Sequence, residues 1–147
     1  MTAYPDTSFL FNLYAPQAHT ARASAHFAAM KGSLQITSLN HFEIINAIQL
    51  ALFRKTILRN HAQAAFAAVE DDLATGATEL VPCDWGAVHG RALRIAGQHT
   101  AKGGHRGFDI LHVATAIELG AKEFLTFDSR QGVLAKAVGL KVKPGMA

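Results

Sequence analysis

The fold is decided by residues 107–142, which read GFDILHVATAIELGAKEFLTFDSRQGVLAKAVGLKV. Apolar residues recur from Ile110 to Ile117 at the i, i+3, i+4, i+7 spacing of a helix that faces a core. Gly120 and Gly139 stand where helices are expected to end, each just before a short run of strand type. The stretch therefore predicts helix, strand, helix and strand in succession, which is the pattern of parallel α/β proteins.

The same alternation extends over the rest of the chain. We expect strands at residues 2–5, 34–37, 79–81, 123–126 and 140–142. We expect helices at residues 8–14, 20–31, 39–54, 61–75, 85–99, 109–119 and 130–138. Right-handed connections between parallel strands place helices on both faces of a sheet. The sequence thus predicts a three-layer α/β fold with a mostly parallel sheet.

Length and composition favour one globular domain that binds no cysteine-ligated metal. The chain has 147 residues, half of them apolar, and a formal net charge of +3, a modest indication of an anionic partner. Cys83 is the only cysteine, which excludes an internal disulfide and suits the reducing cytoplasm. No basic region precedes the apolar N-terminal residues, and polar residues interrupt the charge-poor span 32–53. We therefore expect neither a secretory signal nor a membrane helix.

Four acids stand in charge-poor surroundings. Asp6 is the only charged residue in residues 1–21, and Glu43 is the only one between Lys31 and Arg54. Asp109 opens a predicted helix, and Asp128 directly follows the strand-like run FLTF. No lysine or arginine is expected to pair with these acids, and buried carboxylates repel one another unless a cation joins them. Oxygen ligands of this kind suit Mg²⁺ or Mn²⁺.

Each of these acids also has an ordinary structural interpretation. Asp6 and Asp128 can equally serve as N-caps of the helices that follow them. Asp109 can be a first-turn residue favoured by the helix dipole, and Glu43 can point to solvent from its helix. These alternatives stay open for each acid taken alone. They leave unexplained why two of the acids end strands at one sheet edge while the other two lie near the starts of helices that leave it.

Three segments contain the four acids: PDTSFLFNLY at residues 5–14, TSLNHFEIINAI at residues 37–48, and the stretch at residues 107–142. They resemble the successive motifs of a PIN domain, and specifically of a VapC-type toxin from a bacterial toxin–antitoxin pair. The resemblance implies a single PIN-like domain over residues 1–147, with a five-stranded, mostly parallel sheet flanked by helices. Pro5 departs from the pattern, because an apolar strand residue is more usual there.

The resemblance implies a Mg²⁺- or Mn²⁺-dependent endoribonuclease in which metal-activated water attacks the phosphodiester. It assigns the catalytic and metal-binding roles to Asp6, Glu43, Asp109 and Asp128. It assigns supporting roles to Ser8 and Thr126. It further implies a structured RNA substrate (tRNA or rRNA), a cognate VapB-like antitoxin, and a homodimer. The alternative is a non-catalytic PIN module that binds RNA or an antitoxin.

Candidate RNA contacts are Lys102, Arg106 and Arg130. The first two belong to HTAKGGHRGFD, residues 99–109, which we expect to be a mobile, glycine-rich loop that runs into Asp109. An ordinary solvated loop is the competing interpretation. His112 lies three residues after Asp109, but a site rich in oxygen ligands does not need an imidazole, so we do not assign it to the metal.

Overall fold

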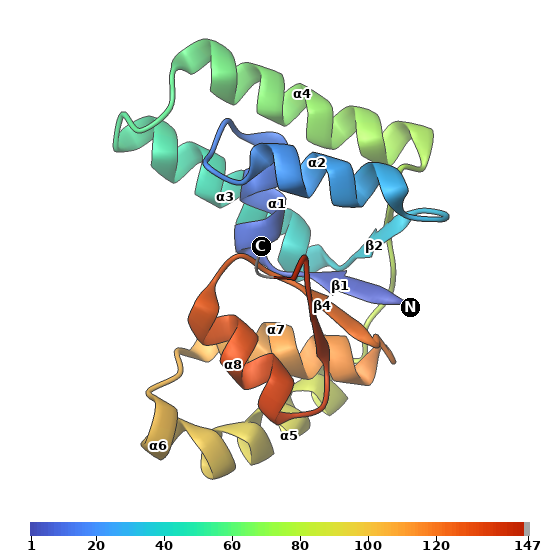
Figure 1. Cartoon of the computed structure of the whole chain (residues 1–147), viewed down its shortest axis with the longest axis vertical. Helices are drawn as coiled ribbons and strands as arrows, with labels where there is room; N and C mark the ends of the chain where they lie inside the picture. Colours follow the sequence, from blue (N-terminus) through green and yellow to red (C-terminus); the bar gives the residue numbers. More distant parts are fainter. Residues whose placement is uncertain (146–147) are drawn as a thin grey trace. The chain divides into compact units, whose positions relative to one another are not determined.

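The structure is a computed structural model that describes residues 1–145 (Figure 1). The strands are β1 Ala3–Pro5, β2 Leu34–Ile36, β3 Thr78–Leu80, β4 Glu123–Leu125 and β5 Lys141–Lys143. The helices are α1 Thr7–Tyr14, α2 Thr20–Ala29, α3 Ser38–Phe53, α4 Arg59–Thr75, α5 Trp85–Ile95, α6 Ala101–Gly103, α7 Gly107–Glu118 and α8 Ser129–Ala137, with a π-helical turn, η1, at Ala96–Thr100. Each predicted strand and helix is present, and the predicted α/β class is confirmed.

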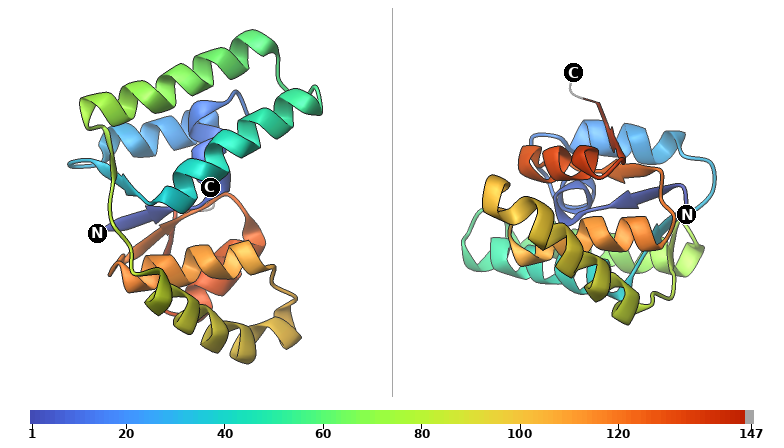
Figure 2. Two further views of the ribbon diagram at one scale, coloured as in Figure 1. Left: turned by 180° about the vertical axis from the view of Figure 1, so that it is seen from behind. Right: turned by 90° about the horizontal axis from the view of Figure 1, so that it is seen from below.

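The chain divides into two compact units. The N-terminal unit is Pro5–Val81, in which β2 and β3 pair in parallel with Leu34 opposite Thr78. Its helix α1 packs against α2, α3 and α4 (Figure 2). The buried core of this unit consists of Phe9, Leu10, Ala23, Leu34, Ile36, Ile44, Ile48, Ala62, Ala65 and Val69.

The C-terminal unit contains Met1–Tyr4 and the chain from Pro82 onward. Its strands follow the order β1-β4-β5, and β4 pairs in parallel with β5, with Phe124 opposite Val142. Helix α7 packs against α5 and α8, and α8 packs against β5. Its core includes Tyr4, Val88, Ile95, Ile110, Val113, Ala114, Ala116, Phe124, Leu134 and Ala135.

The expectation of one five-stranded sheet is wrong, because the hydrogen-bonded strands of residues 1–145 form a three-stranded sheet and a two-stranded sheet. The ends of β1 and β2 give a physical reason. Pro5 has no N–H to donate, and its carbonyl accepts from Asn40 Nδ2 at 2.8 Å. The N–H of Thr37, just past β2, donates to Asn40 Oδ1 at 2.7 Å. These backbone groups are therefore bonded to a side chain and not to a neighbouring strand.

The expectation of a loop at residues 99–109 is also wrong in part. The helical backbone continues past α5 through η1 and α6, so Lys102 lies on α6. The turn ends at Gly104, whose φ of +67° is a left-handed conformation that glycine adopts readily, and its N–H donates to Thr100 O at 2.7 Å. Among the helices of residues 1–145, none combines the length and the apolar character that crossing a membrane requires.

Candidate functional site

Asp6 begins α1 and is held by its own helix. It directly follows β1 and is 2% exposed. Its Oδ1 accepts from the Phe9 N–H at 2.9 Å and from Ser8 Oγ at 2.7 Å. The carboxylate is thus an N-cap in a fixed orientation, as the structural interpretation of the sequence allowed. Ser8 makes the contact that its predicted supporting role requires, while the role itself stays a prediction.

Glu43 is half-buried on α3 and is connected to the segment that carries Asp6. Its Oε1 accepts from Thr7 Oγ1 at 2.9 Å, and Thr7 immediately follows Asp6. One helical turn earlier, Asn40 donates to the carbonyl of Pro5, which immediately precedes Asp6. Hydrogen bonds on both sides of Asp6 therefore hold its segment against α3, and the N-terminal unit brings the elements that carry the first two acids together.

Sequence reasoning missed both residues that make these connections. Asn40 is fully buried, and its Oδ1 also accepts from the Thr37 hydroxyl at 3.0 Å. Thr37 and Asn40 form a capping box at the start of α3. The sequence did contain a pattern that indicates a role for Asn40. Thr-x-x-Asn is a variant of the capping-box pattern at the start of a helix, and it places an amide one turn before Glu43. Thr7 had no comparable signal.

Asp109 lies in the first turn of α7, in the C-terminal unit. Its Oδ2 is 3.3 Å from Nε of Arg106, so the expectation that no basic side chain accompanies the four acids is wrong here. The two residues are three apart, with Arg106 at the helix N-cap, which brings the side chains within reach. The Arg106 side chain is 72% exposed and that of Asp109 is 21% exposed. Solvent screens such a pair, so Arg106 can leave Asp109 at a cost of about 0–1 kcal/mol.

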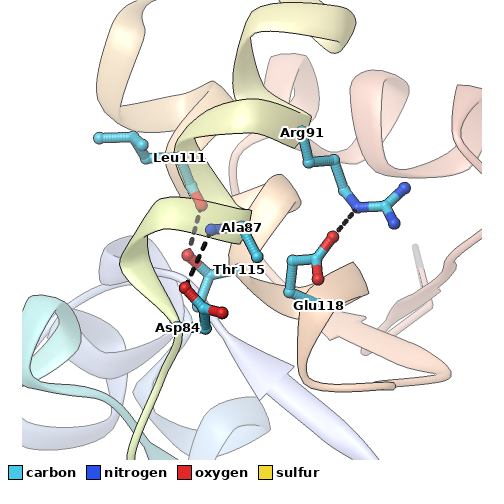
Figure 3. Close-up of polar contacts among 6 residues, drawn as sticks. All are labelled: Asp84, Ala87, Arg91, Leu111, Thr115 and Glu118. Atoms are coloured by element: carbon cyan, nitrogen blue, oxygen red, sulfur yellow. Dashed lines mark hydrogen bonds and ion pairs between the residues drawn. The ribbon is translucent and has the colours of Figure 1, made fainter.

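An ion pair connects helix α7 to α5, and further hydrogen bonds lie within each of the two helices (Figure 3). Glu118 near its C-terminus forms an ion pair with Arg91 of α5. The Thr115 hydroxyl donates to the carbonyl of Leu111 at 2.6 Å, inside the helix. Asp84 begins α5 by accepting from the Ala87 N–H at 3.0 Å. Because α5 and α7 are packed together, the ion pair between them helps to position the helix that carries Asp109.

A buried hydrogen bond joins β1 to α7 inside the same unit. Tyr4 Oη and His112 Nδ1 are 2.7 Å apart, and the residues are 0% and 2% exposed. The Tyr4 ring also stacks on Phe124 of β4, with ring centroids 5.9 Å apart. His112 thus uses one ring nitrogen to bind Tyr4, which favours the interpretation of this histidine as a structural residue.

Asp128 is the N-cap of α8 and is half-buried. Its Oδ1 accepts from the N–H groups of Arg130 at 2.8 Å and Gln131 at 3.2 Å. Its own N–H donates to Oγ1 of buried Thr126 at 2.9 Å. Both of these helix N–H groups bind the same carboxylate oxygen, Oδ1. Arg130 itself lies in the first turn of α8 and is exposed.

Comparison with known proteins gives the family. A family model described as the PIN domain matches residues 3–137. The chain belongs to the PIN domain family. Among solved structures it is similar to Mycobacterium tuberculosis VapC20, described as a Sarcin-Ricin loop cleaving toxin, with 20% identity and a TM-score of 0.68. The match covers 97% of this chain and 100% of that one, and at this identity it shows the shared fold. A comparison with the curated proteins found no match.

The resemblance to PIN domains is therefore confirmed, and PIN domains are typically nucleases that use divalent metals. In this PIN domain each unit contributes two of the four acids. Within the part of the chain described, no three or more His, Cys, Asp and Glu side chains lie close enough to hold one metal ion. The donors are carboxylates only, and helix N–H groups hold Asp6 and Asp128 through Oδ1. This chemistry fits a hard divalent cation, and the shared four-acid cluster stays a prediction.

Cys83 takes no part in this chemistry. Burial raises the pKa of its thiol, and the negative charges of Asp84 and Glu118 raise it further. A thiol with a raised pKa is a poor nucleophile and a poor metal ligand. Its side chain packs against the core of the C-terminal unit, as a small apolar residue does.

Proposed function

We propose that this PIN domain is a divalent-metal-dependent endoribonuclease and the toxin of a VapBC-type toxin–antitoxin pair. The proposal treats residues 1–147 as one PIN-like domain, because the family model runs through both compact units. The observation that carries it is the placement of the acids in a PIN chain. Asp6 follows β1 and Asp128 follows β4, and these strands are neighbours in one sheet. Glu43 lies on a helix held by a part-buried hydrogen bond to Thr7, and Asp109 lies on a helix held by the buried contact between Tyr4 and His112.

In this proposal Asp6, Glu43, Asp109 and Asp128 are the catalytic and metal-binding residues. Bound by these carboxylates, Mg²⁺ or Mn²⁺ would supply Lewis-acid activation of water and positive charge for the phosphodiester. The protein contributes preorganised ligands. Ser8 and the α1 N–H groups orient Asp6, Thr7 orients Glu43, and Thr126 together with the α8 N–H groups orients Asp128. Arg106, weakly held by Asp109, is available to bind a substrate phosphate.

The proposed partners are a structured RNA (tRNA or rRNA), a VapB-like antitoxin and a second copy of the chain, all in the cytoplasm. Exposed apolar side chains on α3 support a protein-binding surface in the N-terminal unit: Phe42 is 63% exposed and Phe53 is 82% exposed. The positive net charge supports RNA binding in general terms. Sequencing the 5′ ends of RNA fragments after expression of the protein would identify the substrate.

The test replaces carboxylates by amides. Asn is as good an N-cap as Asp, so Asp6→Asn should leave the protein folded. Asp109→Asn should do so as well, because the ion pair with Arg106 that it removes is exposed to solvent and contributes little stability. Each should reduce divalent-dependent RNA cleavage about 100-fold or more, because several kcal/mol of transition-state stabilisation are lost. Asp84→Asn is the matched control, since Asp84 caps α5 outside the proposed site and its change should leave cleavage intact. Undiminished cleavage by either site variant, with EDTA-sensitive wild-type activity, would refute the assignment.

The alternative function is a non-catalytic module that binds RNA or an antitoxin. The observation in its favour is that no group of three or more metal-ligating side chains comes together within residues 1–145. The same assay separates the two functions, because a binding module retains RNA or antitoxin affinity while the purified wild-type protein cuts no RNA with Mg²⁺ or Mn²⁺.

A further inference from the structure

Phe108 is an aromatic residue whose position gives it a use in RNA binding. It lies immediately before Asp109 in the first turn of α7 and is 53% exposed. Residues one and two turns further along the same helix face are buried: His112 is 2% exposed and Thr115 is 0% exposed. Phe108 therefore lies at the exposed end of a helix face that is otherwise buried. The other end of α7 is held by the ion pair between Glu118 and Arg91, so the backbone that carries the ring is fixed.

An exposed apolar side chain is common on protein surfaces, and what distinguishes Phe108 is its surroundings. Arg106 is two residues away and its side chain is 72% exposed. Lys102 is exposed on α6. Between them in the sequence, the His105 ring lies against Gly103, so closely that a Cβ on that glycine would overlap it. Residues 102–108, directly before Asp109, therefore carry two exposed cationic residues and an exposed aromatic ring.

We infer that Phe108 is a base-stacking residue, which holds an unpaired base of the RNA next to the proposed site. The inference rests on the proposed function and adds a substrate-binding residue next to that site. A phenyl ring can accept the face of any base, but only when that base is free of a helical stack. Lys102 and Arg106 supply the charge that matches the flanking phosphates, which an apolar peptide does not require. Phe108 lies beside a proposed metal ligand, so the stacked base would lie close to the reaction.

The test measures RNA binding in EDTA, where no cleavage occurs. The probes are a fluorescent oligoadenylate of about 12 nucleotides and an RNA duplex of the same length. Phe108→Leu keeps the apolar volume and removes the aromatic face, and we expect it to weaken oligoadenylate binding about 5- to 150-fold. Duplex binding should change less than twofold, and Phe108→Tyr should restore binding of the single strand. The control is Leu93→Ala on α5, a 76% exposed side chain outside the site, which should bind as the wild type does.

Salt dependence separates stacking from charge contacts and from general damage. A contact to one phosphate contributes about 0.7 to the slope of log K against log salt for a single strand. Phe108→Leu should leave this slope unchanged, whereas Lys102→Ala and Arg106→Ala should each reduce it by about that amount. Equal oligoadenylate affinities of the wild type and Phe108→Leu would overturn the inference, even if Asp6→Asn abolishes cleavage as proposed. An equal loss for single strand and duplex, or a loss confined to antitoxin binding, would overturn it as well.

Discussion

Asn40 provides the most direct test of how the N-terminal half of the site is held together. Its amide accepts from the Thr37 N–H and donates to the carbonyl of Pro5, and all three residues are buried. In Asn40→Ala both backbone groups lose their partner in a place that water does not reach. Each buried, unsatisfied group costs about 1–3 kcal/mol, so we expect the free energy of unfolding to fall by about 2–5 kcal/mol.

The assay is urea unfolding followed by circular dichroism. With an m-value of about 2 kcal/mol/M, the midpoint should fall by about 1–2.5 M. Asn46→Ala is the matched control, because Asn46 is an exposed residue of the same helix, and its change should alter the free energy of unfolding by less than about 0.5 kcal/mol. Under conditions in which Asn40→Ala is fully folded, RNA cleavage should fall about 10- to 100-fold, because the segment of Asp6 loses one of its connections to the helix of Glu43. An Asn40→Ala protein as stable as Asn46→Ala would refute the role given to the hydrogen bonds of Asn40 with Thr37 and Pro5.

Two further predictions concern tyrosines. Tyr4→Phe removes the buried contact with His112 and should lower the free energy of unfolding by about 1–3 kcal/mol, measured by urea titration, and a loss below about 0.5 kcal/mol would contradict the structural role given to this pair. Burial, followed by the hydrogen bond to Asp72, raises the pKa of Tyr14 above the ordinary tyrosine value, so the folded state favours the neutral phenol. The stability that this provides is complete below about pH 10 and is lost as the pH rises further. The free energy of unfolding of the wild type should therefore fall more steeply above about pH 10 than that of Tyr14→Phe, and parallel pH profiles would contradict the assignment.

Much of the fold was predictable because hydrophobic periodicity is a local property. The apolar stripe of α7 and the glycines after α7 and α8 fix those helices and the short strands that follow them. Strand pairing is not local, and it failed where one side chain competed for backbone groups. Asn40 takes the hydrogen bonds at the ends of β1 and β2, and nothing in the surrounding sequence says where its amide will point.

For the candidate site, the acidic residues could be predicted from the sequence, but several of their side-chain contacts could not. The acids were recognisable because a lone charge in an apolar segment is unusual. Asp6 begins a helix directly after β1, and Asp128 begins one three residues after the end of β4. The pairing of Asp109 with Arg106 was missed, because the spacing of three residues becomes a contact only once the backbone before α7 is known. Thr7 and Phe108 were missed for a different reason: each is an ordinary residue type that gains significance from its position next to an acid.

Asp6 and Asp128 are N-caps of helices, and the proposed function also makes them metal ligands. These two roles have a consequence for how such proteins diverge. Each carboxylate starts a helix, and an amide can start that helix equally well. A single replacement of oxygen by nitrogen would therefore abolish the proposed cleavage while the protein continues to fold. Drift from nuclease to inert binding protein would meet almost no stability barrier at these two positions, and selection for cleavage alone would keep them acidic.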